Sequence, residues 1–91
     1  MYLLITYDIS SDKRRNKIDK LLSSYGFRVN YSVFELEVTK SKYRVIIETL
    51  EDMMSERDSV RIYHHDKATV PKSIELNPKL SNPFEKEASY V

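Results

Sequence analysis

Two apolar stripes with the spacing of an α-helix limit how this chain can fold more than any other feature of it. They lie within residues 13–25 and 40–54, and in each the apolar residues recur three or four positions apart, which places them on one face of a helix. The sequence therefore predicts two helices that each bury one side. The buried residues are expected to be Ile18, Leu21, Leu22 and Tyr25 in the first helix, and Tyr43, Ile46, Ile47, Leu50 and Met54 in the second.

Extended segments surround the two helices. Residues 2–8, 27–38 and 58–65 are rich in side chains that favour strands. Within 27–38 the apolar positions change from odd to even numbers, and a one-residue shift exchanges the two faces of a strand. We therefore expect a bulge or a tight turn near residues 30–33 that divides this segment into two short strands.

The resulting order, β-α-β-β-α-β, is typical of an α+β, ferredoxin-like fold, in which an antiparallel sheet carries both helices on one face. With 91 residues the chain has room for a single domain. Residues 72–76 have the composition of an extra C-terminal edge strand, so we expect the domain to span residues 1–78 and to leave a loosely held tail at 79–91. Gly26 follows the first helix, where a left-handed residue is expected.

Composition removes several classes of function. The chain has no cysteine, which excludes disulfides, thiolate catalysis and cysteine-ligated metal sites. Its single glycine excludes a glycine-rich phosphate-binding loop, and no apolar run approaches the roughly 20 residues that span a bilayer. Residues 1–8 lack a basic leader and reach a carboxylate too early for a signal peptide, so we expect a cytoplasmic protein with no membrane association.

Basic residues concentrate around the first helix, although the net charge of the whole chain is only +1. Such a cluster can bind a polyanion such as nucleic acid, and a solvated helix face is the plain alternative. Arg14 and Arg15 stand at the helix N-terminus, where cations oppose the helix dipole, and they lie one short loop from Asp8. The basic residues between positions 11 and 30 are Lys13, Arg14, Arg15, Lys17, Lys20 and Arg28.

Asp8 ends the first strand on the face that also carries Tyr2, Leu4 and Thr6. A second copy of the chain would cover that face economically and would bring two Asp8 carboxylates near a two-fold axis. Paired carboxylates with arginines nearby suit Mg²⁺, which activates water and polarises a phosphodiester. Read alone, an Asp in this place is a helix-entry cap or a turn residue, and the residues by themselves leave both interpretations open.

Other chemistry-bearing residues have structural explanations. His64 and His65 are adjacent in the last expected strand and point to opposite faces, so they cannot readily chelate one ion. The serines have no accompanying His/Asp constellation that would make one of them a nucleophile. The seven tyrosines lie mostly at core-facing or sheet positions, where packing explains them better than stacking on bases.

Three short motifs follow one another between residues 7 and 35. They are Tyr7-Asp8-Ile9-Ser10, Asp12-Lys13-Arg14-Arg15-Asn16-Lys17 and Arg28-Val29-Asn30-Tyr31-Ser32-Val33-Phe34-Glu35. In this order and spacing they resemble the CRISPR-associated (Cas) family conventionally numbered two, the small non-integrase member of the spacer-acquisition pair. The resemblance covers about residues 1–65.

The resemblance implies a homodimer formed through sheet faces, in which Asp8 is the catalytic residue and the Mg²⁺ ligand, one from each protomer. Arg15, Arg28 and Phe34 match family positions linked to the site or the substrate path. Lys17 stands where some members have arginine, so it keeps the charge and loses the bidentate fork. The expected site therefore consists of Asp8, with Arg14, Arg15, Lys17 and Arg28 binding nucleic acid, and with Tyr7 and Phe34 in support.

Two functions follow from the resemblance. The first is a Mg²⁺-dependent endonuclease that cuts single-stranded RNA or double-stranded DNA and acts in spacer acquisition with the Cas integrase. The second is a non-catalytic dimeric scaffold that binds duplex DNA and bridges integrase dimers. A toxin-like RNA-cleaving relative with a similar fold is a third, more distant interpretation.

Overall fold

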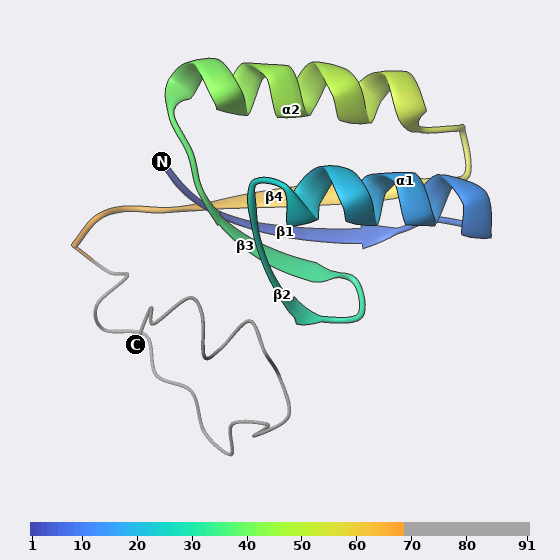
Figure 1. Ribbon diagram of the computed structural model, residues 1–91, viewed down its shortest axis with the longest axis horizontal. Helices are drawn as coiled ribbons and strands as arrows, with labels where there is room; N and C mark the ends of the chain where they lie inside the picture. Colours follow the sequence, from blue (N-terminus) through green and yellow to red (C-terminus); the bar gives the residue numbers. More distant parts are fainter. Residues whose placement is uncertain (69–91) are drawn as a thin grey trace.

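The computed structural model describes residues 1–68, and its element order is the β-α-β-β-α-β predicted from the sequence. Four strands form one sheet in the order β2-β3-β1-β4, with every neighbouring pair antiparallel. Both helices cover the same face of this sheet, so the fold is α+β and ferredoxin-like (Figure 1). The expected edge strand at 72–76 and the boundary at residue 78 lie outside the described residues. The elements are β1 (Tyr2–Asp8), α1 (Asp12–Ser23), β2 (Gly26–Asn30), β3 (Val33–Glu37), α2 (Lys40–Met53) and β4 (Ser59–His65).

The hydrophobic core lies between the sheet and the two helices. On β1 the buried face carries Leu3, Ile5 and Tyr7, and Phe34 and Leu36 of β3 extend it across the sheet. Burial is complete along the centre of each predicted helical stripe and partial at its edges, because a helix that rests on a sheet makes contact along a line. The buried core residues are Leu3, Ile5, Tyr7 and Ile9, Ile18 and Leu22, Phe34, Leu36 and Val38, and Ile46 and Leu50.

The segment at 27–38 divides as predicted. β2 and β3 pair as a hairpin whose register shifts between Arg28 and Asn30, and residues 31–32 form the turn. The change of phase is not an exchange of faces, because Arg28 lies opposite Phe34 and Phe27 opposite Glu35, so even-numbered residues face the helices in both strands. The apolar Phe27 of β2 lies on the other face of the sheet, in the same row as Leu4.

The prediction that Gly26 is a left-handed residue at the end of the first helix is wrong. Gly26 begins β2 without a left-handed backbone. The C-cap of α1 is Ser24, which has a helical backbone and donates its N–H to the carbonyl of Leu21. Glycine is required here because β3 leaves no room for a side chain. A Cβ at position 26 would lie 2.3 Å from the carbonyl oxygen of Glu35 and 2.7 Å from Leu36 Cγ on the neighbouring strand.

No helix within residues 1–68 covers the second face of the sheet. On β1 this face carries Tyr2, Leu4 and Thr6, each of which is only partly buried, so no layer of residues 1–68 packs over it. Leu4 lies between Glu35 of β3 and Tyr63 of β4, which places acidic and aromatic side chains in one row. We call this surface the open sheet face.

Neither helix is long and apolar enough to span a bilayer, within the part of the chain that the structure describes.

Candidate functional site

A pocket of about 450 Å³ opens where the end of β1, the first turns of α1 and the β2–β3 hairpin meet. The end of β1 and the start of α1 are joined by the short loop 9–11, and the antiparallel pairing of β1 with β3 brings the hairpin beside them. The pocket therefore collects four of the seven residues of the expected site, namely Tyr7, Asp8, Arg15 and Arg28. The residues used below that line it are Tyr7, Asp8, Arg15, Asp19, Arg28 and Tyr31.

Asp8 stands at the mouth of the pocket as the last residue of β1. It is exposed, and its carboxylate has no hydrogen-bond or ion-pair partner among residues 1–68. The N-cap of α1 is Ser11, whose hydroxyl accepts the backbone N–H of Arg14 at 3.3 Å. The interpretation of Asp8 as the helix cap is therefore wrong, and its carboxylate is free to bind a cation.

Arg15 lies on the α1 side of the pocket, above the β1–α1 loop. Its guanidinium forms an ion pair with Asp12 at 2.8 Å and donates to the backbone carbonyl of Ile9 at 3.1 Å. The side chain is 40% exposed and the Asp12 carboxylate is 88% exposed. An ion pair this open to water contributes little energy, so a phosphate can replace Asp12 at small cost.

Arg28 enters the pocket from β2 and is held from several sides. Its Nη2 lies 3.0 Å from Asp19 Oδ2, and its Nη1 donates to the carbonyl of Tyr31 at 3.0 Å. The guanidinium carbon lies 5.2 Å from the centre of the Phe34 ring, a cation–π distance. Arg28 is only 33% exposed on its side chain, so its position is fixed before any ligand arrives.

Tyr7 contacts the same two groups that hold Arg28, the Asp19 carboxylate and the Tyr31 carbonyl. Its hydroxyl donates to Asp19 and lies 3.3 Å from the carbonyl of Tyr31, and its ring stacks on Phe34 with centroids 6.2 Å apart. Burial raises the pKa of Tyr7, and the hydrogen bond to the Asp19 carboxylate raises it further. The phenol therefore stays protonated at neutral pH and serves as a donor. The structure thus places Tyr7 and Phe34 under the pocket, beneath Arg28.

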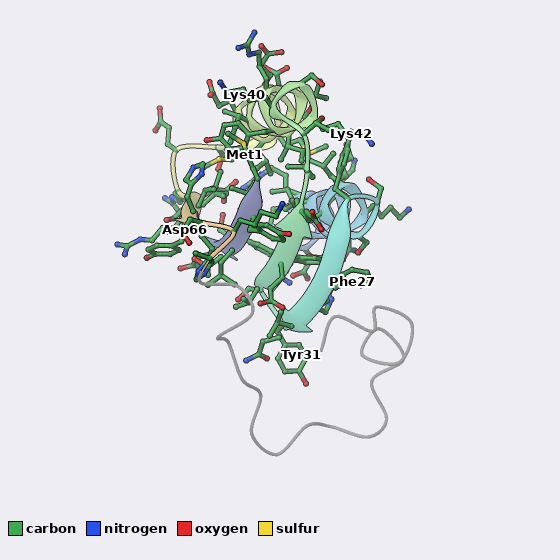
Figure 2. The ribbon with its side chains drawn as sticks, turned by 90° about the vertical axis from the view of Figure 1, so that its left-hand side faces the viewer. Met1, Phe27, Tyr31, Lys40, Lys42 and Asp66 are labelled. Carbon is green, nitrogen blue, oxygen red and sulfur yellow. The ribbon has the colours of Figure 1, made fainter. Side chains whose placement is uncertain are left out.

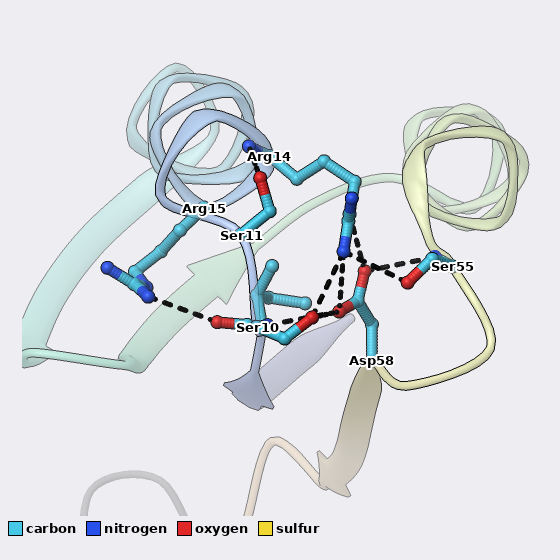
Figure 3. Close-up of polar contacts among 7 residues, drawn as sticks. Ser10, Ser11, Arg14, Arg15, Ser55 and Asp58 are labelled. Atoms are coloured by element: carbon cyan, nitrogen blue, oxygen red, sulfur yellow. Dashed lines mark hydrogen bonds and ion pairs between the residues drawn. The ribbon is translucent and has the colours of Figure 1, made fainter.

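Arg14 turns away from the pocket (Figure 3). Its Nε lies 2.8 Å from Asp58 Oδ2, and its Nη2 donates to the hydroxyls of Ser10 and Ser55 at 3.1 and 2.9 Å. The Asp58 side chain is completely buried, and the hydrogen bond from Arg14 holds its pKa well below the usual value. These contacts offset the cost of a cation at the helix N-terminus, and they join α1 to the turn between α2 and β4.

Sequence reasoning missed both acidic partners in these networks. Asp19 is an acidic residue inside a basic segment, where no pattern marks it as a partner of Arg28. Asp58 lies 44 residues from Arg14, beyond the reach of any local pattern. Lys17 is exposed on α1 and does not line the pocket.

The histidines behave as expected. His64 contacts the ring of Tyr43 edge-on, with centroids 5.4 Å apart, while neighbouring side chains of a strand point to opposite faces. Among residues 1–68 no three His, Cys, Asp or Glu side chains come together as a ready-made metal cage.

Comparison with known proteins points to one family. The family model for CRISPR associated protein Cas2 matches residues 1–72. The CRISPR-associated endoribonuclease Cas2 2 of Methanospirillum hungatei is 46% identical over 61 residues, which cover 67% of this chain and 68% of that protein. The Cas2 1 protein of Chloroflexus aurantiacus, named likewise, is 48% identical over 65 residues, covering 69% and 70%.

Solved structures of Cas2 proteins also match this chain. The crystal structure of Streptococcus pyogenes Cas2 superposes with a TM-score of 0.74 at 34% identity. The superposition covers 85% of this chain and 100% of the Streptococcus pyogenes chain. A chain from a partial Cas6-RT-Cas1–Cas2 complex superposes with a TM-score of 0.70 at 32% identity, covering 84% and 90%.

Proposed function

Because this chain belongs to the CRISPR-associated Cas2 family, we propose that it is a metal-dependent endonuclease that cleaves phosphodiester bonds in spacer acquisition. The observation that carries the proposal is the unpaired carboxylate of Asp8, which shares one pocket with the guanidinium groups of Arg15 and Arg28. The names of the relatives support nuclease activity, and the structural neighbour from a complex that contains Cas1 supports an integrase partner.

Mg²⁺ is the cofactor that suits these groups. It prefers oxygen ligands, keeps several of its waters, and is commonly held by one or two carboxylates, so a complete cage of protein ligands is not needed. Asp8 offers one carboxylate per chain, free of any competing partner within residues 1–68. When bound, the ion would activate water and polarise the phosphodiester.

The charges of the pocket assign roles to the remaining residues. Asp8 and Asp19 balance Arg15 and Arg28, so the pocket attracts a phosphate only after a cation has neutralised Asp8. Arg15 and Arg28 then bind phosphate oxygens, as guanidinium groups do in pairs of hydrogen bonds. Lys17 extends the positive path along α1. We assign Arg14 to the fold, because Asp58 and two serines already engage its guanidinium.

We further propose a homodimer through the open sheet face. Tyr2, Leu4 and Thr6 are only partly buried by residues 1–68, and an isologous contact buries the same surface on both copies. Asp8 belongs to this face, so the dimer brings its carboxylate toward that of the partner. Sedimentation velocity tests the contact: Leu4→Lys is expected to give a folded monomer, and an unchanged dimer would contradict it.

The decisive experiment compares the wild type with Asp8→Asn on labelled single-stranded RNA and duplex DNA, each with Mg²⁺ and with a chelator. We expect cleavage to need both the metal and the carboxylate, with a loss of at least about 100-fold in the variant, as is typical when an electrostatic group is removed from an active site. Asp52→Asn, an exposed aspartate on α2, is the matched control and should cut normally. Cutting by Asp8→Asn at the wild-type rate would refute the assignment.

A scaffold without catalysis is the second candidate, and the structural match to a chain from a complex with Cas1 favours it. The same arginines would then hold the backbone of duplex DNA in a sequence-independent and salt-sensitive manner. In the experiment above, wild-type protein that binds duplex DNA but cuts neither substrate would establish this function in place of the nuclease.

A further inference from the structure

Tyr31 is the most exposed of the large apolar residues that the structure describes. Its exposed fraction is 85%, whereas the other exposed members of this class lie between 41% and 49%. It stands in the turn at the end of the β2–β3 hairpin, where it projects beyond the strands (Figure 2). The apolar pattern placed Tyr31 among residues that pack in the sheet, and the structure instead presents it to solvent beside Asp8 in the pocket.

The backbone of Tyr31 is fixed although its ring is free. Its N–H donates to Asn30 Oδ1 at 2.8 Å, and its carbonyl accepts from Arg28 Nη1 at 3.0 Å and lies 3.3 Å from the Tyr7 hydroxyl. The next carbonyl, that of Ser32, accepts the N–H of Tyr7 at 3.1 Å. A residue in an ordinary exposed loop would lack these backbone hydrogen bonds. Here the groups that build the pocket also hold the turn that carries the ring.

A ring held in this way is suited to contact a flat ligand. Binding orders a flexible loop at an entropic cost, and a turn that is already hydrogen-bonded avoids most of that cost. An aromatic ring beside a phosphate-binding site offers a stacking surface for the base of the same nucleotide or its neighbour. Stacking requires an open base face, which an unpaired nucleotide has and a base inside a duplex lacks.

We propose that Tyr31 is a stacking platform for an unpaired base adjacent to the phosphate held by Arg15 and Arg28, so that the site binds single-stranded nucleic acid, or a frayed end, in preference to an intact duplex. This inference rests on the proposed function, because it takes the pocket to be the place where the nucleic-acid backbone binds. The contact uses the π-face of the ring, so the hydroxyl of Tyr31 contributes nothing essential.

Binding measurements separate stacking from backbone contacts. Affinity is measured for a single-stranded oligonucleotide, a duplex of the same length, and an abasic strand that keeps the sugar-phosphate backbone. Tyr31→Ala is expected to weaken binding of the single strand by about 5- to 150-fold, the range that one base–aromatic stack gives, and to leave binding of the abasic strand unchanged. Tyr31→Phe should bind as the wild type does. The proposal would be overturned if Tyr31→Ala weakened binding of the ordinary single strand and of the abasic strand equally, or weakened neither.

A spectroscopic test observes the contact itself. The chain contains no tryptophan, so Tyr31→Trp introduces a single reporter. Its fluorescence should be quenched by the single strand and unaffected by the abasic strand, while Val45→Trp on the exposed side of α2 should respond to neither. Quenching that is the same with both strands would contradict stacking.

The outcomes also distinguish this inference from the proposed function. Arg28→Gln removes a backbone contact and should weaken binding of all three ligands. If Arg28→Gln weakens binding and Tyr31→Ala does not, the pocket stands and the stacking role is wrong. If the wild type binds no nucleic acid, both proposals are wrong.

Discussion

Arg28 of β2 and Asp19 of α1 face each other with Nη2 and Oδ2 3.0 Å apart, and the pair lies against the aromatic ring of Phe34. The other Asp19 oxygen accepts from the hydroxyl of Tyr7. One carboxylate therefore ties the first helix to two strands of the sheet and orients an arginine at the mouth of the pocket. A guanidinium fixed in this way binds phosphate with less loss of side-chain freedom than a mobile one.

This geometry makes Asp19 a positioning residue that acts through Arg28. Asp19→Asn is expected to lower kcat by about 10- to 100-fold, the effect of misplacing a binding group slightly. KM should not rise, because the substitution also removes a negative charge that repels the substrate. In a double-mutant cycle, Asp19→Asn should cause no further loss of kcat once Arg28→Gln is present. Losses that multiply instead would show that Asp19 acts independently of Arg28.

The ion pair between Arg14 and Asp58 is expected to stabilise the fold, and to do so in a pH-dependent manner. The pKa of Asp58 is lowered from an ordinary value of 3.8, chiefly by its hydrogen bond with Arg14. The folded state therefore favours the ionised carboxylate, so its contribution is complete above about pH 4 and is lost as the pH falls below that value.

Urea denaturation at several pH values tests this contribution. Asp58→Asn should lower the urea midpoint at pH 7, and the difference from the wild type should shrink below pH 4, where Asp58 of the unfolded state takes up a proton while the native carboxylate is still ionised. Asp52→Asn, which changes an exposed aspartate, controls for net charge. A difference that does not depend on pH would contradict the assignment of the effect to ionised Asp58.

Tyr7 should be the last tyrosine among residues 1–68 to ionise when the protein is titrated with alkali. Its pKa lies above the usual 10.0 because it is buried and donates to Asp19. The folded state thus holds the proton while the unfolded state releases it near pH 10, so folding stability falls as the pH rises above that value. Ultraviolet absorbance of phenolate measures the titration. Tyr7→Phe should remove the final component, and its persistence would contradict the assignment.

Gly26→Ala should destabilise the protein by about 1–3 kcal/mol, the usual cost of forcing extra atoms into a packed region. The added Cβ would lie 2.3 Å from the Glu35 carbonyl oxygen, which belongs to the backbone of β3 and cannot move alone. Ser23→Ala, at the exposed last position of α1, is a suitable control. Chemical denaturation measures both. A change of less than about 0.5 kcal/mol for Gly26→Ala would contradict the close approach, since surface substitutions fall in that range.

The sequence determined the elements of this fold and their order. In β1 both faces carry apolar residues, so only the structure shows that Ile5 lies in the core. The helical stripes of α1 and α2, in contrast, already identified core residues such as Ile18 and Ile46. Local periodicity is sufficient for this, because the face of a strand or helix that becomes buried repeats with the geometry of that element. The change of phase before Phe34 likewise located the hairpin.

Tertiary structure alone decided what the polar side chains do. Arg14 and Arg15 are neighbours of the same chemistry, yet one is locked to Asp58 and the other lines the pocket. Successive residues of a helix point about 100° apart, so the position of the α2–β4 turn selects which arginine it receives. Tyr31 is exposed because its turn ends the strand pairing. Such contacts join segments that are distant in the sequence, and only the packing of the whole chain determines them.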